Sequence, residues 1–347
     1  MLFEEIRSGG CCSYLLACDA TCSGVLVDPE LSQLDRILAL LSKSGTRLHY
    51  LVDTHTHADH FSATHELARR LHVPVVMHTD SQAPYVDVRV DDGETIIAGQ
   101  LRLRVIYTPG HTTDSISLAL PDRVFTGDTL LRLATGRTDL PTGNAEQLYH
   151  SVFDKLLHLD DSVAVYPGHN YKDVPVTSIA QERAQNPRLQ KRDKSAFVEQ
   201  MHALNISMPD HLTEALRTNR TGGKTVAQLL DEAARQIAFM SMEEVLTRSA
   251  AAAADLVILD VREREAFDAG HIPGARHVPR GQLELRIDQV LPDPSTRVVT
   301  YCEFGKVSTL AAATLRTMGF NRAVALDGGM KSWREAGHPV EVNASAQ

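Results

Sequence analysis

The chain has 347 residues, enough for about two domains of ordinary size. Hydrophobic residues make up 43% of it, as in a globular protein that can bury sizeable cores. Its 35 basic and 44 acidic residues give a net charge of −9 without a long basic block, which argues against nucleic acid or an anionic membrane surface as a partner. No apolar run approaches the length of about eighteen residues that a membrane-spanning helix needs.

The N-terminal stretch MLFEEIRSGG differs from an export signal, because it carries Glu4, Glu5 and a pair of glycines. We therefore expect a cytoplasmic protein whose five cysteines stay reduced. Four of them lie in or beside a predicted hairpin and are interpreted as buried or strand thiols: Cys11, Cys12, Cys18 and Cys22.

Strand-like and helix-like runs alternate through the first part of the chain. Residues 30–45 place apolar side chains at helical spacing and end at Gly45, and residues 61–71 and 145–159 also indicate helices. The expected strands are the short apolar runs at 13–18, 24–29, 48–54, 73–78, 100–108, 115–120, 123–128 and 163–167. Strands with interleaved helices indicate a layered α/β or α+β fold.

The later part of the chain contains a polar helical region and then a second α/β pattern. Residues 178–235 are mainly helical, and the turn-rich stretch LRTNRTGGKT at 216–225 is the best linker candidate. Strand-like runs at 256–261, 297–302 and 323–326, with a helix at 306–319, predict a small unit with a parallel sheet. We therefore expect a first domain at 1–222, a linker at 223–239 and a second domain at 240–347.

A dense set of metal-binding side chains follows the predicted strands. The stretch THTHADH at 54–60 places three histidines and an aspartate in seven positions. The candidate ligands are His55, His57, Asp59, His60, His111, Asp128 and His169. Loops at the same ends of a sheet can bring such distant residues together, and imidazole and carboxylate ligands suit zinc, iron or manganese.

Four motifs carry a resemblance to a known family: THTHADH, TPGHT at 108–112, TGDTLL at 126–131 and YPGHNY at 166–171. Together they resemble the metallo-β-lactamase superfamily in its glyoxalase II and persulfide dioxygenase branch, over roughly residues 1–220. GRTD at 136–139 and ERAQNPRL at 182–189 are more similar to the dioxygenases than to the thiolester hydrolases. The resemblance implies an N-terminal αββα sandwich.

The resemblance also implies a ligand set. In the dioxygenases one Fe(II) per chain is held by two histidines and one aspartate, which here are His55, His111 and Asp128. Three protein ligands on one face of the iron leave its other coordination positions open for substrate and O₂. The hydrolases hold two metals and recruit further residues, which here are either groups around the iron or ligands of a second metal: His57, Asp59, His60 and His169.

Two further residues match expected glutathione contacts, namely Arg137 in GRTD and Tyr171 in HNY. A purely structural role is the alternative, in a salt bridge for Arg137 and in packing for Tyr171. Relatives usually read GDTLLIRGxGRTDF, whereas this chain reads GDTLLRLATGRTDL. Arg132 therefore comes one place early. We expect this shift to affect the residues that line the site, but not the metal ligands.

A second chemical motif, CEFGKVS at 302–308, follows a predicted strand and opens a helix. Backbone N–H groups and the helix N-terminus at such a place stabilise a thiolate, and Lys306 adds positive charge. ILDVRE at 258–263, GHIPGARHV at 270–278 and LDGGMKSW at 326–333 surround it.

These surroundings resemble a rhodanese domain over about residues 240–342. The resemblance implies a small C-terminal α/β domain that transfers sulfur through a persulfide on Cys302. Its persulfide loop is formed by Glu303, Phe304, Gly305, Lys306, Val307 and Ser308. Glu303 occupies a position where basic residues are frequent in the family, and Asp260 and Arg262 are expected to order the loop.

A persulfide is the one species that both domains can handle. We therefore expect a fusion enzyme that oxidises glutathione persulfide with O₂ to sulfite and glutathione, and that transfers sulfane sulfur between thiosulfate and glutathione. The alternative is a binuclear zinc thiolester hydrolase, similar to glyoxalase II, with an attached sulfur-relay domain. A homodimer is among the assemblies that the resemblance allows.

Overall fold

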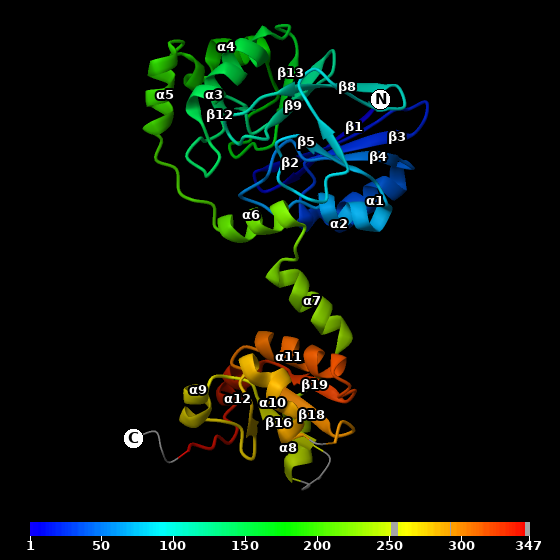
Figure 1. Cartoon of the computed structure of the whole chain (residues 1–347), viewed down its shortest axis with the longest axis vertical. Coiled ribbons are helices and arrows are strands. Elements are labelled where there is room, and N and C mark those ends of the chain that lie inside the picture. The colour runs from blue at the N-terminus through cyan, green and yellow to red at the C-terminus, as the bar shows by residue number, and fades with distance from the viewer. Residues whose placement is uncertain (251–255, 292, 344–347) are drawn as a thin grey trace. The chain divides into compact units, whose positions relative to one another are not determined.

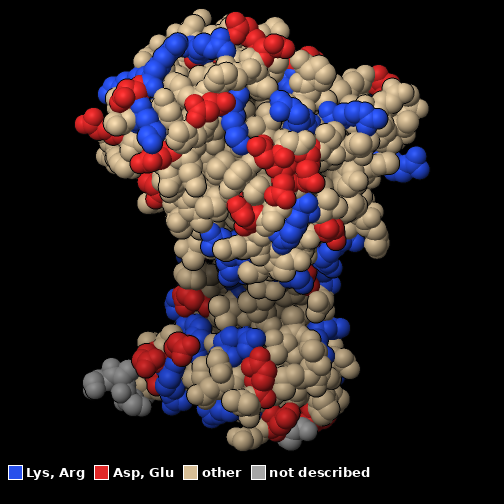
Figure 2. Space-filling view, turned by 45° about the horizontal axis from the view of Figure 1, so that its top comes forward, with Lys and Arg blue, Asp and Glu red and all other residues tan. Residues whose placement is uncertain are grey.

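The computed structural model describes residues 1–250, 256–291 and 293–343. Its contacts divide the chain into two compact units, Met1–Gly223 and Lys224–Gln347, whose elements are labelled in Figure 1. Among the described helices none is long and apolar enough to cross a bilayer. On the face visible in Figure 2, acidic and basic side chains are interspersed.

The first unit contains two six-stranded sheets. The first sheet has the order β1-β2-β3-β4-β5-β6, with strands Leu2–Ser8, Cys11–Ala17, Ser23–Val27, Arg47–Val52, Val75–His78 and Val88–Val90. The second has the order β14-β13-β10-β9-β8-β7, with strands Thr177–Ser178, Ala164–Pro167, Arg123–Gly127, Ile116–Ala119, Leu101–Tyr107 and Thr95–Ala98. A small ribbon is formed by β11 (Leu130–Leu131) and β12 (Ala134–Thr135). Strands β1, β6, β7 and β14 were not predicted from the sequence, while the expected hairpin of β2 and β3 is present.

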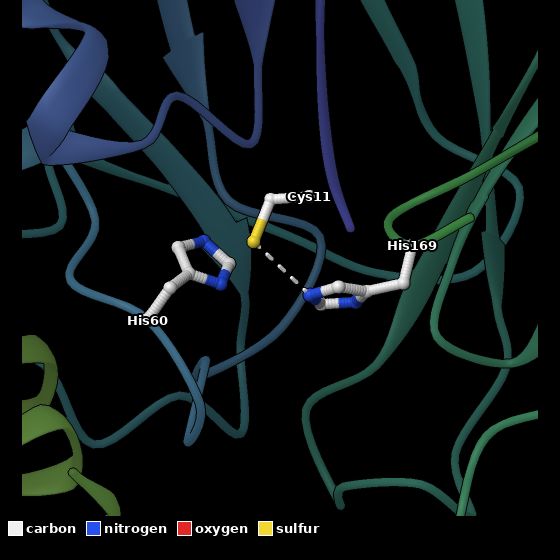
Figure 3. Close-up of side chains that lie close together, drawn as sticks. All are labelled: Cys11, His60 and His169. Atoms are coloured by element: carbon white, nitrogen blue, oxygen red, sulfur yellow. Dashed lines mark hydrogen bonds between the residues drawn. The ribbon is translucent and has the colours of Figure 1, made fainter. Parts of the chain in front are cut away.

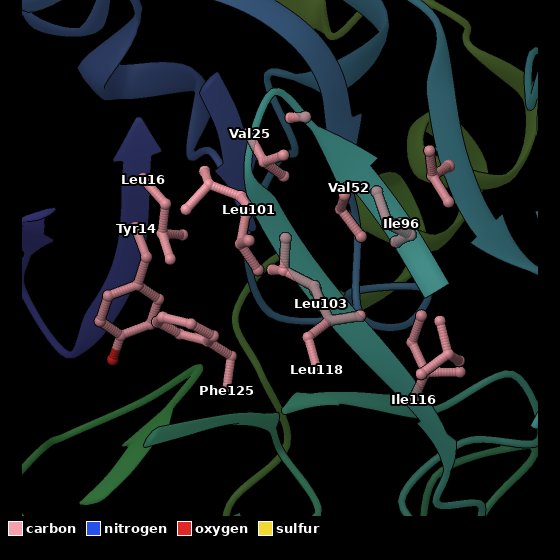
Figure 4. Packing of buried hydrophobic residues seen from close by; sticks show 14 of the residues in the cluster. Tyr14, Leu16, Val25, Val52, Ile96, Leu101, Leu103, Ile116, Leu118 and Phe125 are labelled. Atoms are coloured by element: carbon pink, nitrogen blue, oxygen red, sulfur yellow. The ribbon is translucent and has the colours of Figure 1, made fainter. Parts of the chain in front are cut away.

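Alternating side chains hold the layers together, because successive residues of a strand face opposite sides of its sheet. Tyr14 and Leu16 of β2 face the second sheet and pack in one core with Leu118 and Phe125 (Figure 4). Leu15, between them, joins another core with the helices on the outer face. The sheets therefore pack face to face with helices outside, and the predicted αββα sandwich is confirmed.

Six helices belong to the first unit: α1 (Leu34–Ser44), α2 (Thr64–Leu71), α3 (Ala145–His150), α4 (Ile179–Gln185), α5 (Lys194–His202) and α6 (Leu212–Thr221). The cores assign α1 and α2 to the outer face of the first sheet, and α3, α4 and α5 to that of the second. The expected helix at 145–159 is present, but its second half is wound as a π-helix and then a 3₁₀ turn.

The second unit is built on one sheet of order β15-β19-β18-β16-β17, which is parallel as the sequence predicts; β15 and β17 were not predicted. Its strands are Phe239–Met240, Ala323–Leu326, Arg297–Tyr301, Leu256–Asp260 and Arg276–His277. Its described helices are α7 (Val226–Gln236), α8 (Met242–Ala250), α9 (Arg264–Ala269), α10 (Leu283–Val290), α11 (Lys306–Thr317) and α12 (Gly329–Glu335). The cores place α10 and α11 on one face of the sheet, and α8 and α12 on the other.

Residues 223–239, which the sequence indicates as a linker, contain helix α7. This helix packs on α11. Residues 224–239 of this segment therefore belong to the second compact unit.

Candidate metal centre and sulfur-transfer loop

Loops at the ends of four strands bring the predicted metal ligands of the first unit together. His55 follows β4, His111 follows β8, Asp128 follows β10 and His169 follows β13. One donor atom each from His55, His111 and Asp128 lie within 4.8 Å of one another, and all three residues are buried. The three residues predicted to hold the metal therefore form one cluster.

Hydrogen bonds fix which nitrogen of His55 faces that cluster. The Thr54 hydroxyl donates its single hydrogen to Asp28 at 2.8 Å, so its oxygen accepts from His55 Nδ1 at 2.9 Å. His55 Nε2 is then left with a lone pair, and it is buried with no hydrogen-bond partner among the described residues. A buried imidazole nitrogen with a free lone pair and no hydrogen-bond partner is suited to bind a metal ion, so the donor set fits a metal.

His111 is oriented in the same way. Its Nδ1 donates to the backbone oxygen of Arg137 at 2.8 Å, and its Nε2 lies 3.7 Å from Asp128 Oδ2. Burial lowers the pKa of His55 to about 3, so its imidazole is neutral. Burial alone would raise the pKa of Asp128, but His169 and His111 hold it below its usual range. Neutral imidazoles and an ionised carboxylate are the forms that bind metals.

The four remaining candidates surround this cluster. His169 lies between two carboxylates, 2.7 Å from Asp128 Oδ1 through Nδ1 and 2.7 Å from Asp59 Oδ2 through Nε2. Donors of His57, Asp59 and His60 also converge within 4.8 Å. Despite burial, Asp59 raises the pKa of His60 to about 10. The geometry thus brings together every ligand that either metal stoichiometry requires.

Cys11 is a residue of this centre that the sequence analysis missed. Its Sγ lies 3.4 Å from His169 Nε2, and it forms a third donor group with His169 and His60 (Figure 3). The backbone fixes it there, because Cys12 N donates to Gly168 O and Asn170 N donates to Gly10 O. Although burial acts in the opposite sense, bonds to His169 and His60 lower the pKa of the Cys11 thiol. No signal in the sequence links the first hairpin to the distant YPGHNY motif.

Asn219 of α6 is the second residue that was missed. Its amide nitrogen donates to His57 O at 2.9 Å and to His60 O at 2.8 Å, and its oxygen accepts from Ser62 N at 3.0 Å. Asn219 lies inside the stretch that the sequence favoured as a linker. That interpretation was wrong for residues 216–221, because they belong to helix α6 and Asn219 on that helix bonds the metal loop.

Two glycines leave room for the ligands. A Cβ on Gly127, which has a φ of +48°, would lie 2.4 Å from the Thr54 hydroxyl. A Cβ on Gly136 would lie 1.8 Å from the backbone oxygen of Asp128 and 3.1 Å from His111 Nδ1. Either methyl group would displace a ligand or its partner.

Tyr171 and Arg137 differ in how free they are to meet a substrate. Tyr171 is 67% exposed, stacks on the His169 ring at 5.0 Å and donates a hydrogen bond to Asp59. Arg137 is paired with Asp139 at 2.6 Å and bonds the backbone oxygens of residues 206 and 207.

The segment that departs from the relatives' pattern lies beside the centre without entering the ligand set. Buried Arg132 donates to Val174 O at 3.1 Å and lies 5.7 Å from the Tyr166 ring. Leu133 has a φ of +55°, and its N–H donates to Glu182 at 3.0 Å. Neither residue is among the metal donors, so the departure leaves the donor set unchanged.

In the second unit, Cys302 follows β18, a central strand, at the carboxyl end where open parallel sheets bind ligands. Its Sγ is buried and accepts from Ser308 N at 3.3 Å, in the first turn of α11. Gly305 has a φ of +83° and turns the loop into that helix. The predicted persulfide loop, Glu303 to Ser308, thus follows the cysteine directly and returns one backbone N–H, that of Ser308, to its sulfur.

Asp260 and Arg262, which the sequence analysis expects to order this loop, are linked to it through Glu303. Arg262 is buried and pairs with Asp260 at 2.6 Å, and it also reaches Glu303 at 3.2 Å. Phe304, Lys306 and Val307 are exposed around the cysteine.

The comparisons with known proteins cover both units. The metallo-beta-lactamase superfamily model matches residues 13–169, and the rhodanese-like domain model matches residues 241–336. The mitochondrial persulfide dioxygenases ETHE1 of Bos taurus and Homo sapiens are each 35% identical over 213 residues, which is 61% of this chain and 84% of theirs.

Solved structures agree with these matches. The crystal structure of ETHE1 from Myxococcus xanthus is 42% identical, has a TM-score of 0.63 and covers 65% of this chain and 100% of its own. A metallo-beta-lactamase from Staphylococcus aureus, 21% identical with a TM-score of 0.60, covers 94% of this chain and 98% of its own, and shows the fold alone. The chain belongs to the persulfide dioxygenase family of the metallo-β-lactamase superfamily, with a rhodanese domain fused C-terminal to the dioxygenase-like unit.

Proposed function

We propose that the first unit oxidises glutathione persulfide with O₂ to sulfite and glutathione, using one Fe(II) held by His55, His111 and Asp128. The observation that carries this proposal is the buried cluster of two Nε2 atoms and one carboxylate, together with the dioxygenase relatives. Water completes the balance: one persulfide, one O₂ and one water give glutathione, sulfite and two protons. Bound iron supplies the redox chemistry and open positions for substrate and O₂.

The residues of this chain prepare the site for that chemistry. Thr54 and the Arg137 carbonyl keep the protons of the two histidines on Nδ1, which leaves both Nε2 atoms for the metal. Tyr171, exposed above His169, is proposed to contact the glutathione moiety. Arg137 is proposed to contribute to the same wall, because its backbone oxygen accepts from the ligand His111.

In the second unit we propose that Cys302 accepts sulfane sulfur from thiosulfate, releases sulfite and passes the sulfur to glutathione. The reverse transfer uses the same Cys302 persulfide. The Ser308 N–H, in the first turn of α11, donates to Sγ and is placed to stabilise negative charge on the sulfur. Replacement of Cys302 by serine is expected to abolish transfer while O₂ uptake persists, since each unit holds its own site residues.

The second candidate is a binuclear zinc thiolester hydrolase, which the convergence of His57, Asp59, His60 and His169 favours. Metal analysis combined with an oxygen electrode separates the two. We expect one iron per chain and O₂ uptake with glutathione persulfide. Two zincs per chain and no O₂ uptake would contradict the dioxygenase proposal.

A matched pair of variants tests the ligand assignment. Asp128→Asn is expected to lose the bound iron and to reduce O₂ uptake by at least about a hundredfold, because a charged ligand is removed. His49→Gln alters an exposed histidine of β4 outside the cluster and is expected to retain both. Equal iron content in the two variants would contradict the assignment.

A further inference from the structure

Glu303, the residue next to Cys302, holds two arginines that border the sulfur-transfer loop. Its Oε2 accepts from Arg262 at 3.2 Å, and its Oε1 pairs with Arg334 of α12. Arg262 is buried and already paired with Asp260 at 2.6 Å. A single carboxylate beside the nucleophile therefore occupies cations that an anionic substrate would otherwise meet.

The position of Glu303 is fixed by α12. Met330 N donates to the backbone oxygen of Cys302 at 2.8 Å, and Lys331 N donates to that of Glu303 at 3.0 Å. A Cβ on Gly329 would lie 2.8 Å from the Glu303 backbone oxygen, so the helix approaches the loop closely. Backbone and side chain of Glu303 are both held by one helix, which fixes its carboxylate between Arg262 and Arg334 on the residue that follows Cys302.

The remaining surface of the loop is mostly apolar. Phe304 is 67% exposed and Val307 is 42% exposed. Lys306 is exposed, and no ion pair involving it is found within the described residues. The loop thus offers one unpaired cation and two apolar side chains to an incoming sulfur donor.

From this arrangement we propose that Glu303 is a specificity-determining residue, which disfavours dianionic donors such as thiosulfate and favours organic donors with a single negative charge. The proposal rests on the sulfurtransferase function proposed above and names the substrate class of that site. A dianion is repelled twice as strongly as a monoanion by the same carboxylate, and it must compete with Glu303 for the arginines. An organic group can contact Phe304 and Val307 instead.

The transfer step is the same for either donor. The Cys302 thiolate attacks the outer sulfur, a new S–S bond forms, and the donor's S–S bond breaks with its electron pair leaving on the departing group. That group is sulfite from thiosulfate and a sulfinate from a thiosulfonate. No external oxidant or reductant is needed.

The test compares thiosulfate with benzenethiosulfonate, a donor that carries one negative charge less, using the full-length protein and glutathione as acceptor. In Glu303→Gln we expect kcat/KM to rise roughly tenfold for thiosulfate and about threefold for benzenethiosulfonate, because the electrostatic effect scales with donor charge. Glu284→Gln, which removes the same charge from an exposed pair with Arg280, is expected to change neither. Added salt should reduce the difference between wild type and Glu303→Gln.

A second variant keeps the inference testable if Glu303→Gln does not fold. Arg334→Gln leaves Glu303 without one partner, so kcat/KM for thiosulfate should fall more than that for benzenethiosulfonate. Equal changes for the two donors in both variants would show that Glu303 only braces the loop, and would overturn the inference. If the wild type transfers sulfur from neither donor, the proposed sulfurtransferase function fails and this inference fails with it.

Discussion

At the scale of single residues, the metal centre depends on groups that never touch the metal. Thr54 accepts from His55 only because it gives its own hydrogen to Asp28. Asp28 is buried and also accepts from the Thr54 backbone at 2.7 Å, so the three residues act as one relay. The relay selects the tautomer of His55 that presents Nε2.

Thr54→Val removes this relay while preserving side-chain volume. We expect iron affinity to fall by about 10- to 100-fold, since partners of this kind contribute that much to metal binding. Thr54→Ser keeps the hydroxyl and should restore most of the affinity. Iron retained after dialysis against graded chelator concentrations measures the effect, and equal retention in the valine and serine variants would refute the relay.

Glu182 gives a prediction on pH. It is fully buried and bonds Leu133 N and Asn186, and burial raises its pKa above the ordinary 4.5. The unfolded chain therefore ionises this group first as pH rises, and the folded state loses stability above about pH 4.5 relative to the unfolded state.

Glu182→Gln removes that penalty. Its free energy of unfolding, relative to wild type, should increase as pH rises above 4.5 and level off once Glu182 ionises in the folded state. Urea unfolding at a series of pH values measures the difference. A difference that is constant with pH would contradict the raised pKa.

At the scale of elements, α6 braces the metal-binding loop through Asn219. Asn219→Ala breaks three buried hydrogen bonds, so we expect a loss of about 2–3 kcal/mol in stability and weaker iron binding. Thr218→Val is the control, because the Thr218 hydroxyl bonds only backbone oxygens of its own helix. If both variants bind iron as tightly as wild type, α6 has no role in the centre.

The elements also show what a sequence can and cannot reveal. Eight of the twelve sandwich strands were predictable, because their apolar side chains alternate or run unbroken between turns, and THTHADH concentrates donors in one loop; β1, β6, β7 and β14 were not predicted. Cys11 and Asn219 were not, because their contacts lie about 160 positions away along the chain. Such contacts depend on how β2 and α6 pack against distant loops. The polar residues of α6 also have the composition of a linker, so the sequence does not show that one of them is buried against a loop.

At the scale of the whole molecule, the boundary of the second unit lies before the rhodanese-like match. That match begins at residue 241, whereas the unit begins at Lys224 and includes α7 and β15. Helix α7 packs on α11, and β15 pairs with β19. A fragment 241–347 would expose both surfaces.

We expect the fragment 224–347 to unfold as one unit and to be at least about 2 kcal/mol more stable than the fragment 241–347, because the shorter one loses buried apolar area and strand pairing. Urea unfolding followed by circular dichroism compares them. Equal midpoints and equal slopes would show that α7 contributes nothing to the unit.

The two glycines at the metal centre, Gly127 and Gly136, have a consequence for protein engineering. A Cβ at either position would meet a ligand or its hydrogen-bond partner. Grafting only the histidines and carboxylates onto another sandwich would therefore copy the donors without the space in which they converge. Transfer of this metal centre to another protein therefore requires glycine at these two positions as well as the metal-binding side chains.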